Sequence, residues 1–238
     1  MMMKKTLTVG LGLFAMLAAA PSAMAEGGKI SGALTFKGKV PKASKIPISK
    51  DNDTCGKGDR IVDEVNVDGK KLLDVAVFID GEIEGYPPGK FKMKYEMIQK
   101  GCRFNPFVSW IPNKEKLKIV NEDPVAHNIH AYEFFGRSRR DLFNFQQPRK
   151  GHTKKQKVKL RKSNIVQLQC DIHDFMRGWI IVPSNPFATT ASKGTYSLDK
   201  VPAGKYTLKA FHPVLGVLDK EVTVKDGETV TVDFEFKK

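Results

Sequence analysis

Short segments in which apolar and polar residues alternate make up most of this chain, and clusters of Gly, Pro, Asn and Asp separate them. Residues 231–236 (Thr-Val-Asp-Phe-Glu-Phe) show the alternation most clearly, and helical periodicity is scarce. Many short strands with turn residues between them predict an all-β protein built from β-sandwiches. The segments expected to be strands are residues 29–37, 74–79, 116–121, 156–160, 165–170, 178–183, 195–198, 205–211, 221–224 and 229–236.

The first 25 residues have the features of a secretory signal peptide. Residues 1–5 carry two lysines, residues 6–20 are apolar or small, and residues 21–25 end in an Ala-x-Ala pattern. The apolar stretch is short for a membrane span, and an uncleaved anchor is the alternative. We therefore expect a periplasmic protein, exported by a cleaved signal peptide, with a mature chain from Glu26 and no stable membrane insertion.

The chain is strongly basic, with 40 Lys and Arg, 26 Asp and Glu, and a formal net charge of +14. Such a field predicts acidic partners: an acidic redox protein, an anionic lipid or a polyanion, with nucleic acid disfavoured for an exported protein. Residues 149–162 concentrate eight of the basic side chains, and their second half alternates like a strand with a charged outer face. This stretch is either a solvated strand face or a docking surface.

Three cysteines are present, Cys55, Cys102 and Cys170. In an oxidising compartment two cysteines tend to pair and leave one odd thiol. Cys170 lies three residues before His173 and six before Met176. We therefore assign a structural disulfide to Cys55 and Cys102 and keep Cys170 as a thiolate ligand.

The segment 169–178 lies between two expected strands and therefore forms a loop at one end of a sandwich. Its thiolate, imidazole and thioether are a soft donor set that suits copper, and a type 1 site combines one Cys, two His and a weak axial Met. The second His is expected within residues 121–130, where a strand runs into a turn and then a His-Asn pair. The alternatives are a buried core Cys170, a packing Met176 and a structural His127.

Two motifs resemble amicyanin, a member of the cupredoxin family. Cys170-x-x-His173-x-x-Met176 followed by Arg-Gly resembles its ligand loop, and residues 127–130 (His-Asn-Ile-His) resemble its upstream His-Asn-Val-His. The resemblance covers about residues 92–183 and implies a cupredoxin Greek-key β-sandwich. It implies one type 1 copper bound by His127, Cys170, His173 and Met176. Asn128 is expected to tie the His127 loop to the Cys170 loop and to donate toward the sulfur.

A second resemblance concerns the end of the chain. Residues 193–198 and 201–208 resemble a carboxypeptidase-regulatory-like (transthyretin-like) β-sandwich, whose opening strand is similar to residues 30–36. The whole chain resembles exported bacterial cupredoxin proteins with such a domain attached, some described as methylamine-utilisation proteins. We expect a signal peptide (1–25), N-terminal strands and a loop (26–91), a cupredoxin domain (92–183) and a smaller transthyretin-like domain (184–238). Residues 26–91 either join the last domain or extend the cupredoxin sheet.

The expected function is electron transfer rather than enzymatic turnover. We expect the ring of His173 to face solvent as the access point for electrons, with Phe107 and Phe175 as an apolar patch around it. The basic residues Arg149, Lys150, Lys154 and Lys155 are expected to steer an acidic partner such as a c-type cytochrome or a dehydrogenase. Asp174 stands where amicyanin-like loops have Pro. The competing functions are a copper carrier or storage protein and a β-domain scaffold with incidental metal.

Overall fold

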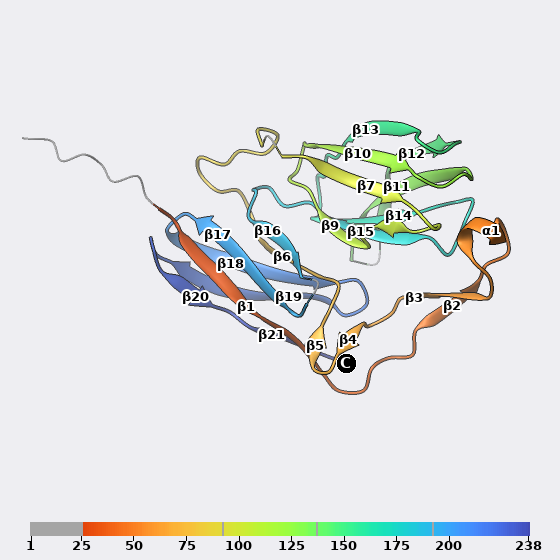
Figure 1. Cartoon of the computed structure of the whole chain (residues 1–238). Helices are drawn as coiled ribbons and strands as arrows, with labels where there is room; N and C mark the ends of the chain where they lie inside the picture. The colour runs from red at the N-terminus through yellow and green to blue at the C-terminus, as the bar shows by residue number, and fades with distance from the viewer. Residues whose placement is uncertain (1–25, 92, 137, 192) are drawn as a thin grey trace, which may run out of the picture.

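The computed structural model describes residues 26–238 except Lys92, Arg137 and Ser192. The expected signal segment lies outside the described residues. The protein is all-β, as predicted, and within the described part of the chain the one helix is α1 (Asn52–Cys55). None of the helices described there is long and apolar enough to cross a membrane. Figure 1 shows the strands gathered into two sandwiches that lie side by side.

The first sandwich combines strands from both ends of the described chain. Strand β1 pairs with β17, β20, β21 and β5, so the first strand lies among C-terminal strands. One sheet contains β17 (Thr195–Val201), β1 (Gly28–Lys37), β5 (Lys71–Leu72), β4 (Val67–Asp68), β20 (Thr229–Thr231) and β21 (Phe234–Lys237). The other sheet contains β16 (Ala188–Ala191), β6 (Val75–Ile79), β18 (Gly204–His212) and β19 (Gly216–Val224). Alternate residues of these strands, including Leu34, Val77 and Phe234, form their shared core.

The second sandwich carries the expected ligands. One sheet contains β13 (Thr153–Lys157), β10 (Lys116–Asn121), β7 (Tyr95–Gln99) and β8 (Phe104–Asn105). The other contains β12 (Ser138–Gln147), β11 (His127–Phe135), β14 (Ile165–Gln169), β15 (Arg177–Ile181) and β9 (Val108–Trp110). Met97, Ile119, Ile129 and Leu168 belong to the core between the two sheets.

A small apolar cluster joins the two sandwiches. Phe78 and Phe211 of the first sandwich pack with Val108, Trp179 and Ile181 of the second. Strand β6 is therefore buried on both faces, and every one of its five residues is buried. The junction leaves one end of the second sandwich free for the ligand loop.

A hairpin of residues 44–62 extends from the first sandwich toward that free end (Figure 1). It consists of β2 (Ser44–Pro47), α1 and β3 (Asp59–Val62), and β2 pairs with β3. We call residues 44–62 the cover hairpin. The expected disulfide is present between Cys55 and Cys102 and joins the cover hairpin to the loop after β7.

Candidate metal centre

The strand register brings His127 and Cys170 to the same edge of a sheet. Strand β11 runs antiparallel to β14, with His130 opposite Gln169. His127 begins β11 and Cys170 follows β14, so the start of one strand meets the end of the other. The loop from Cys170 to Met176 then turns back into β15 and carries His173.

Three of the expected ligands converge on one point. His127 Nδ1 lies 3.1 Å from His173 Nδ1, and Cys170 Sγ lies 3.8 Å from His173 Nδ1. The donor atoms of all three residues lie within 4.8 Å of one another. With metal–ligand bonds of about 2.0–2.3 Å, two ligands of one ion lie roughly 3–4 Å apart. The spacing of these donors therefore fits a single metal ion.

The far nitrogen of each histidine faces a carboxylate. His127 Nε2 lies 2.8 Å from Asp123 Oδ2, and His173 Nε2 lies 2.9 Å from Asp51 Oδ2. An ionised carboxylate only accepts hydrogen bonds, so each Nε2 carries a proton and each ring is turned so that its Nδ1 faces the other donors. Two ring nitrogens 3.1 Å apart can share one cation, either a proton or a metal ion. This arrangement matches the carboxylate–histidine–metal triads of metalloproteins.

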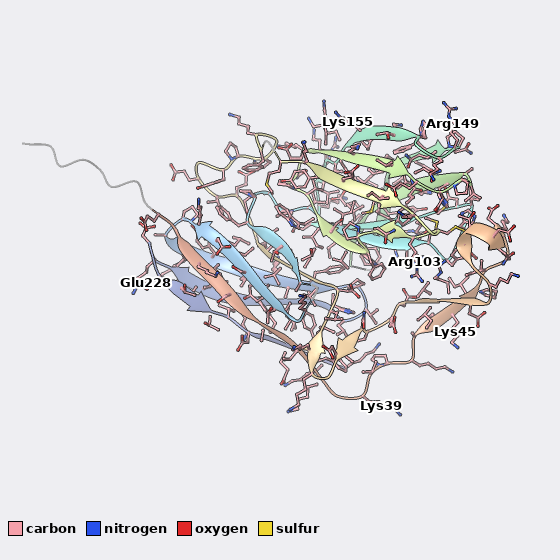
Figure 2. The ribbon with its side chains drawn as sticks, viewed as in Figure 1. Lys39, Lys45, Arg103, Arg149, Lys155 and Glu228 are labelled. Carbon is pink, nitrogen blue, oxygen red and sulfur yellow. A yellow bond between two sulfur atoms is a disulfide. The ribbon has the colours of Figure 1, made fainter. Side chains whose placement is uncertain are left out.

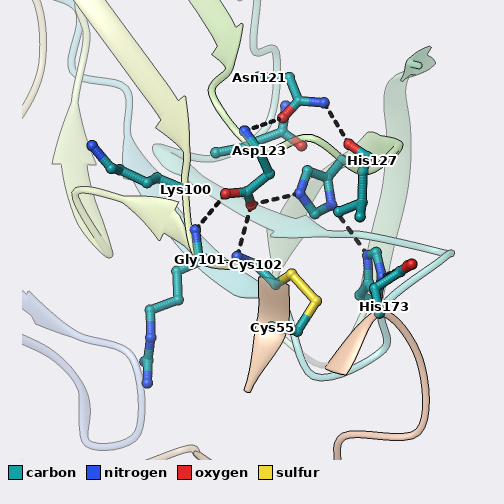
Figure 3. Close-up of polar contacts among 12 residues, drawn as sticks. Cys55, Lys100, Gly101, Cys102, Asn121, Asp123, His127 and His173 are labelled. Carbon is teal, nitrogen blue, oxygen red and sulfur yellow. Dashed lines mark hydrogen bonds and ion pairs between the residues drawn. A yellow bond between two sulfur atoms is a disulfide. The ribbon is translucent and has the colours of Figure 1, made fainter. Parts of the chain in front are cut away.

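Asp123 belongs to a buried network that holds the His127 side of the site (Figure 3). Its carboxylate accepts hydrogen bonds from the backbone of Gly101 at 2.7 Å and of Cys102 at 2.8 Å, in addition to the one from His127. The Asn121 side chain accepts the backbone N–H of Asp123 at 2.9 Å. Burial lowers the pKa of His127 below its usual value despite the bond to Asp123, which favours the neutral, metal-binding ring.

Cys170 is buried, and burial raises the pKa of its thiol above the usual value. Backbone N–H groups of Asn128, His173 and Ile172 oppose that rise because they stabilise a thiolate. The Asn128 side chain accepts a hydrogen bond from Asp171 N at 2.5 Å and donates to Asp171 Oδ2 at 2.8 Å. Asn128 thus ties the His127 strand to the Cys170 loop through Asp171.

Met176 closes the ligand loop. Its backbone N–H donates to the carbonyl of His173 at 2.9 Å, and its side chain is buried in the same apolar cluster as Cys170. The other His, Cys and Asp groupings of the described residues each include Cys102, which is held in the disulfide. A buried thiol, two imidazoles and a nearby thioether form a donor set that suits copper.

The exposure expected for His173 is wrong. Its ring is fully buried, because the cover hairpin places Asp51 against Nε2. The disulfide sulfurs also lie within 4.8 Å of a ring nitrogen of His173. Phe175 is likewise buried, with Arg60 5.3 Å from its ring centre, and Phe107 packs half-buried at the junction of the sandwiches. These two aromatic residues do not form an open apolar patch around His173.

The four basic residues named from the sequence are exposed, but they occupy two regions. Arg149 and Lys150 lie in the loop next to Asn121, since Gly151 N donates to Asn121 O at 2.7 Å. Lys155 lies further along β13, and Lys154 Nζ sits 3.8 Å from the centre of the Phe145 ring. Figure 2 shows Arg149 and Lys155 along one edge of the second sandwich.

Asp51 and Asp123 were not identified from the sequence. Asp123 could have been found from the sequence, because it lies four residues before His127 in the same turn. No sequence pattern points to Asp51, because 122 residues separate it from His173. The three remaining histidines are absent from the metal-binding groupings of the described residues. His130 contacts Asp141 and Asp171, His152 N donates to Arg149 O, and His212 accepts backbone hydrogen bonds from Val214 and Leu215.

Comparison with known proteins returns partial likenesses to cupredoxins. No protein-family profile and no curated protein matches the chain. A purple cupredoxin from Nitrosopumilus maritimus is 18% identical over 37% of this chain and 99% of its own, with a TM-score of 0.31. A reduced Cu(I) form of an amicyanin variant is 14% identical over 44% of this chain and 97% of its own, with a TM-score of 0.30.

A copper-containing nitrite reductase from Thermus scotoductus is 24% identical over 38% of this chain, with a TM-score of 0.29. The chain covers only 22% of that enzyme. Likenesses at this level do not assign the chain to a family, so its function has to be argued from the residues of the site.

Proposed function

We propose that this protein is an exported type 1 copper protein of the cupredoxin kind, which carries single electrons between redox partners. The ligands would be His127, Cys170, His173 and Met176. The observation that carries the proposal is the convergence of two imidazole Nδ1 atoms and one thiol sulfur within 4.8 Å. Both imidazoles have a carboxylate on the opposite nitrogen, which suits a bound cation.

Bound copper would supply a one-electron Cu(I)/Cu(II) couple. The chain would hold the donors in a fixed geometry, because His127 is part of a strand and Cys170 and Met176 flank the ends of two others. All four residues are at most 2% exposed, so water would be kept from the centre. Four protein donors leave no open position for a substrate, which favours an electron carrier over an enzyme.

Electrons would reach the surface through Cys170. His173 is covered, whereas Asp171 is bonded directly to Cys170 and its side chain is 47% exposed. Asn128 and Asn144 each donate a hydrogen bond to Asp171 Oδ2, at 2.8 and 2.9 Å. These bonds would keep this short path from ligand to surface rigid.

The partner would be an acidic redox protein, because the positive charge is concentrated in the part of the chain that holds the site. Residues 92–183 carry 19 Lys and Arg against 8 Asp and Glu, while residues 26–91 and 184–238 together carry 19 against 18. The carboxylates of Asp51, Asp53 and Asp174 are exposed over the ligand loop and would repel such a partner there. Docking would therefore come from the side of Arg149 and Lys150.

Lysines that face one another across β10 and β13 support a role of the positive charge in attracting an acidic partner. Lys116 lies opposite Lys157, and Lys118 lies opposite Lys155. Like charges directly opposite one another destabilise a sheet. Of these four, Lys118 has a salt bridge, to Glu96 at 2.7 Å. We infer that this unfavourable arrangement is kept because it steers an anionic partner, and we call these four residues the lysine pairs.

The remaining parts of the proposal concern location and domains. We propose a periplasmic location after removal of residues 1–25, and a cupredoxin domain over residues 92–183. The pairing of β1 with β17, β20 and β21 supports a transthyretin-like domain formed by residues 184–238 with part of 26–91.

The experiment is redox cycling of the copper-loaded mature chain in the presence of a competing chelator. We expect a reversible one-electron couple, with one copper retained per protein in both oxidation states. Loss of copper to the chelator on reduction would favour a copper carrier. If the protein binds copper but shows no reversible redox couple, this would contradict a function in electron transfer.

A further inference from the structure

His173 receives its carboxylate from a distant part of the chain. Asp51 Oδ2 lies 2.9 Å from His173 Nε2, although 122 residues separate the two. The ring of His173 is fully buried, whereas the side chain of Asp51 is 40% exposed. Asp51 therefore lies at the boundary between the site and solvent and covers the ring that was expected to be open.

The local conformation of the cover hairpin fixes where the Asp51 carboxylate points. Asp51 precedes α1 with φ of 49°, a left-handed conformation that Asp adopts more readily than most residues. Its carbonyl accepts the backbone N–H groups of Thr54 at 2.9 Å and Cys55 at 2.8 Å. Its side chain makes no capping bond to the helix, so the carboxylate is available to His173.

Two further contacts anchor the cover hairpin to the second sandwich. Cys55, the last residue of α1, is bonded to Cys102, whose backbone N–H donates to Asp123. Arg60 Nη2 donates to Cys55 O at 2.8 Å and to Gly101 O at 3.3 Å. Figure 3 shows the disulfide and the Asp123 network next to each other, so the same loop holds both sides of the site.

We propose that Asp51 is a positioning residue that sets the preference of the site for Cu(II) over Cu(I). It accepts the Nε2 proton of His173, which leaves Nδ1 free to face Cys170 Sγ and His127 Nδ1. It also places a negative charge one imidazole ring away from the metal. This inference rests on the copper function proposed above and adds to it.

The direction of the effect follows from charge. A carboxylate hydrogen-bonded to a ligand imidazole makes that ligand more basic, and partners of this kind typically change metal affinity about 10–100-fold. The more highly charged Cu(II) gains more from this than Cu(I). Because Asp51 is partly exposed, solvent screens its charge, and the lower end of that range is expected.

The test is the pair of variants Asp51→Asn and Asp53→Asn. Both remove one negative charge from the same region, but only the Asp51 carboxylate contacts His173. We expect Asp51→Asn to lower the Cu(II) affinity about tenfold and the Cu(I) affinity less, which raises the reduction potential by up to about 59 mV for one electron. Asp53→Asn should change it much less, and Asp51→Glu should restore part of the difference.

A second measurement records the exchange of the His173 Nε2 proton with solvent instead of the reduction potential. In the diamagnetic Cu(I) form, proton NMR can record how fast His173 Nε2–H exchanges with solvent. We expect slow exchange in the natural protein and in Asp53→Asn, and fast exchange in Asp51→Ala, which removes the acceptor. A merely structural role of the hairpin would leave this contrast absent.

The outcomes separate this inference from the function on which it rests. A protein without a thiolate–copper band would overturn the copper function itself. Suppose that the thiolate–copper band and the Cu(I)/Cu(II) redox couple are normal, and that Asp51→Asn and Asp53→Asn have equal reduction potentials. This result would overturn the role of Asp51 and leave the copper function standing.

Discussion

The two histidines of the site are held in different ways. His127 is paired with Asp123, four residues earlier in the same turn, and that carboxylate also accepts two backbone N–H groups. His173 is paired with Asp51, which comes from the cover hairpin and, among the residues that the structure describes, makes this one side-chain bond. The Asp123 side chain is buried and the Asp51 side chain is partly exposed.

This difference indicates a division of roles. A buried carboxylate with three hydrogen bonds cannot be removed without leaving unpaired donors, so Asp123 should matter for folding as well as for metal binding. A partly exposed carboxylate with one bond contributes little to stability, so Asp51 can adjust the metal centre at little cost to the fold.

The largest expected effect is that of Asp123→Ala on the metal-free protein. The change leaves Gly101 N, Cys102 N and His127 Nε2 without their acceptor in a buried site. We expect a loss of about 3–5 kcal/mol in the free energy of unfolding, measured by urea denaturation. Glu122→Ala changes a partly exposed neighbour paired with Lys100 and is the matched control, and equal losses in the two variants would contradict the role of Asp123.

Glu133 is another buried carboxylate, and it lies away from the ligand loop. Its partners are backbone N–H groups and Arg140 rather than a histidine. Burial would raise its pKa, but backbone N–H groups of residues 161–163 and the Arg140 guanidinium outweigh burial and hold its pKa below the usual value of 4.5. At pH 7 we expect Glu133→Gln to cost about 2–3 kcal/mol. A lowered folded-state pKa stabilises the protein above pH 4.5, and this contribution disappears as the pH falls through the folded-state value.

The measurement is the unfolding free energy of the natural protein and of Glu133→Gln between pH 7 and pH 3. Their difference should shrink on acidification. A difference that stays constant or grows would show that Glu133 is not held as a carboxylate.

A smaller effect is expected for Asp51→Ala in the metal-free protein. The bond to His173 is partly screened, so the unfolding free energy should fall by less than about 1 kcal/mol. The same urea titration compares this variant directly with Asp123→Ala. Equal losses in the two would remove the distinction between the two carboxylates.

The smallest expected effect is a gain in stability. Lys155→Glu combined with Lys157→Glu converts both lysine pairs into opposite charges, which should stabilise the sheet by about 0.5–1 kcal/mol. The same variant should react more slowly with an acidic redox protein, with a weaker dependence on salt. Lys39→Glu with Lys45→Glu makes the same charge change away from these pairs. A similar loss of rate in this control would contradict the role of the lysine pairs.

Strands that alternate between a buried and an exposed face could be predicted from the sequence. Residues 116–121 match β10 and residues 29–37 match β1 to within one residue. Strands β11 and β12 were missed: β11 is buried on both faces with polar residues such as Glu133 inside, and β12 is largely polar and exposed at a sheet edge. Residues 229–236, expected as one strand, form β20 and β21 instead.

The parts of the site that lie close together in the sequence could be predicted. Cys170, His173 and Met176 share one loop, and His127 follows a recognisable turn. The contact between Asp51 and His173 depends on how the cover hairpin folds across the end of the second sandwich. No periodicity or spacing encodes such a contact, so neither Asp51 nor the burial of His173 could be read from the sequence.

The central claim is tested most directly by visible and electron paramagnetic resonance spectra of the mature protein with one equivalent of Cu(II), recorded beside Cys170→Ala. The proposed site predicts an intense blue thiolate-to-copper band and a narrow copper hyperfine splitting, both lost in Cys170→Ala. A colourless protein, or weak Cu(II) signals that do not change in Cys170→Ala, would contradict a type 1 copper centre.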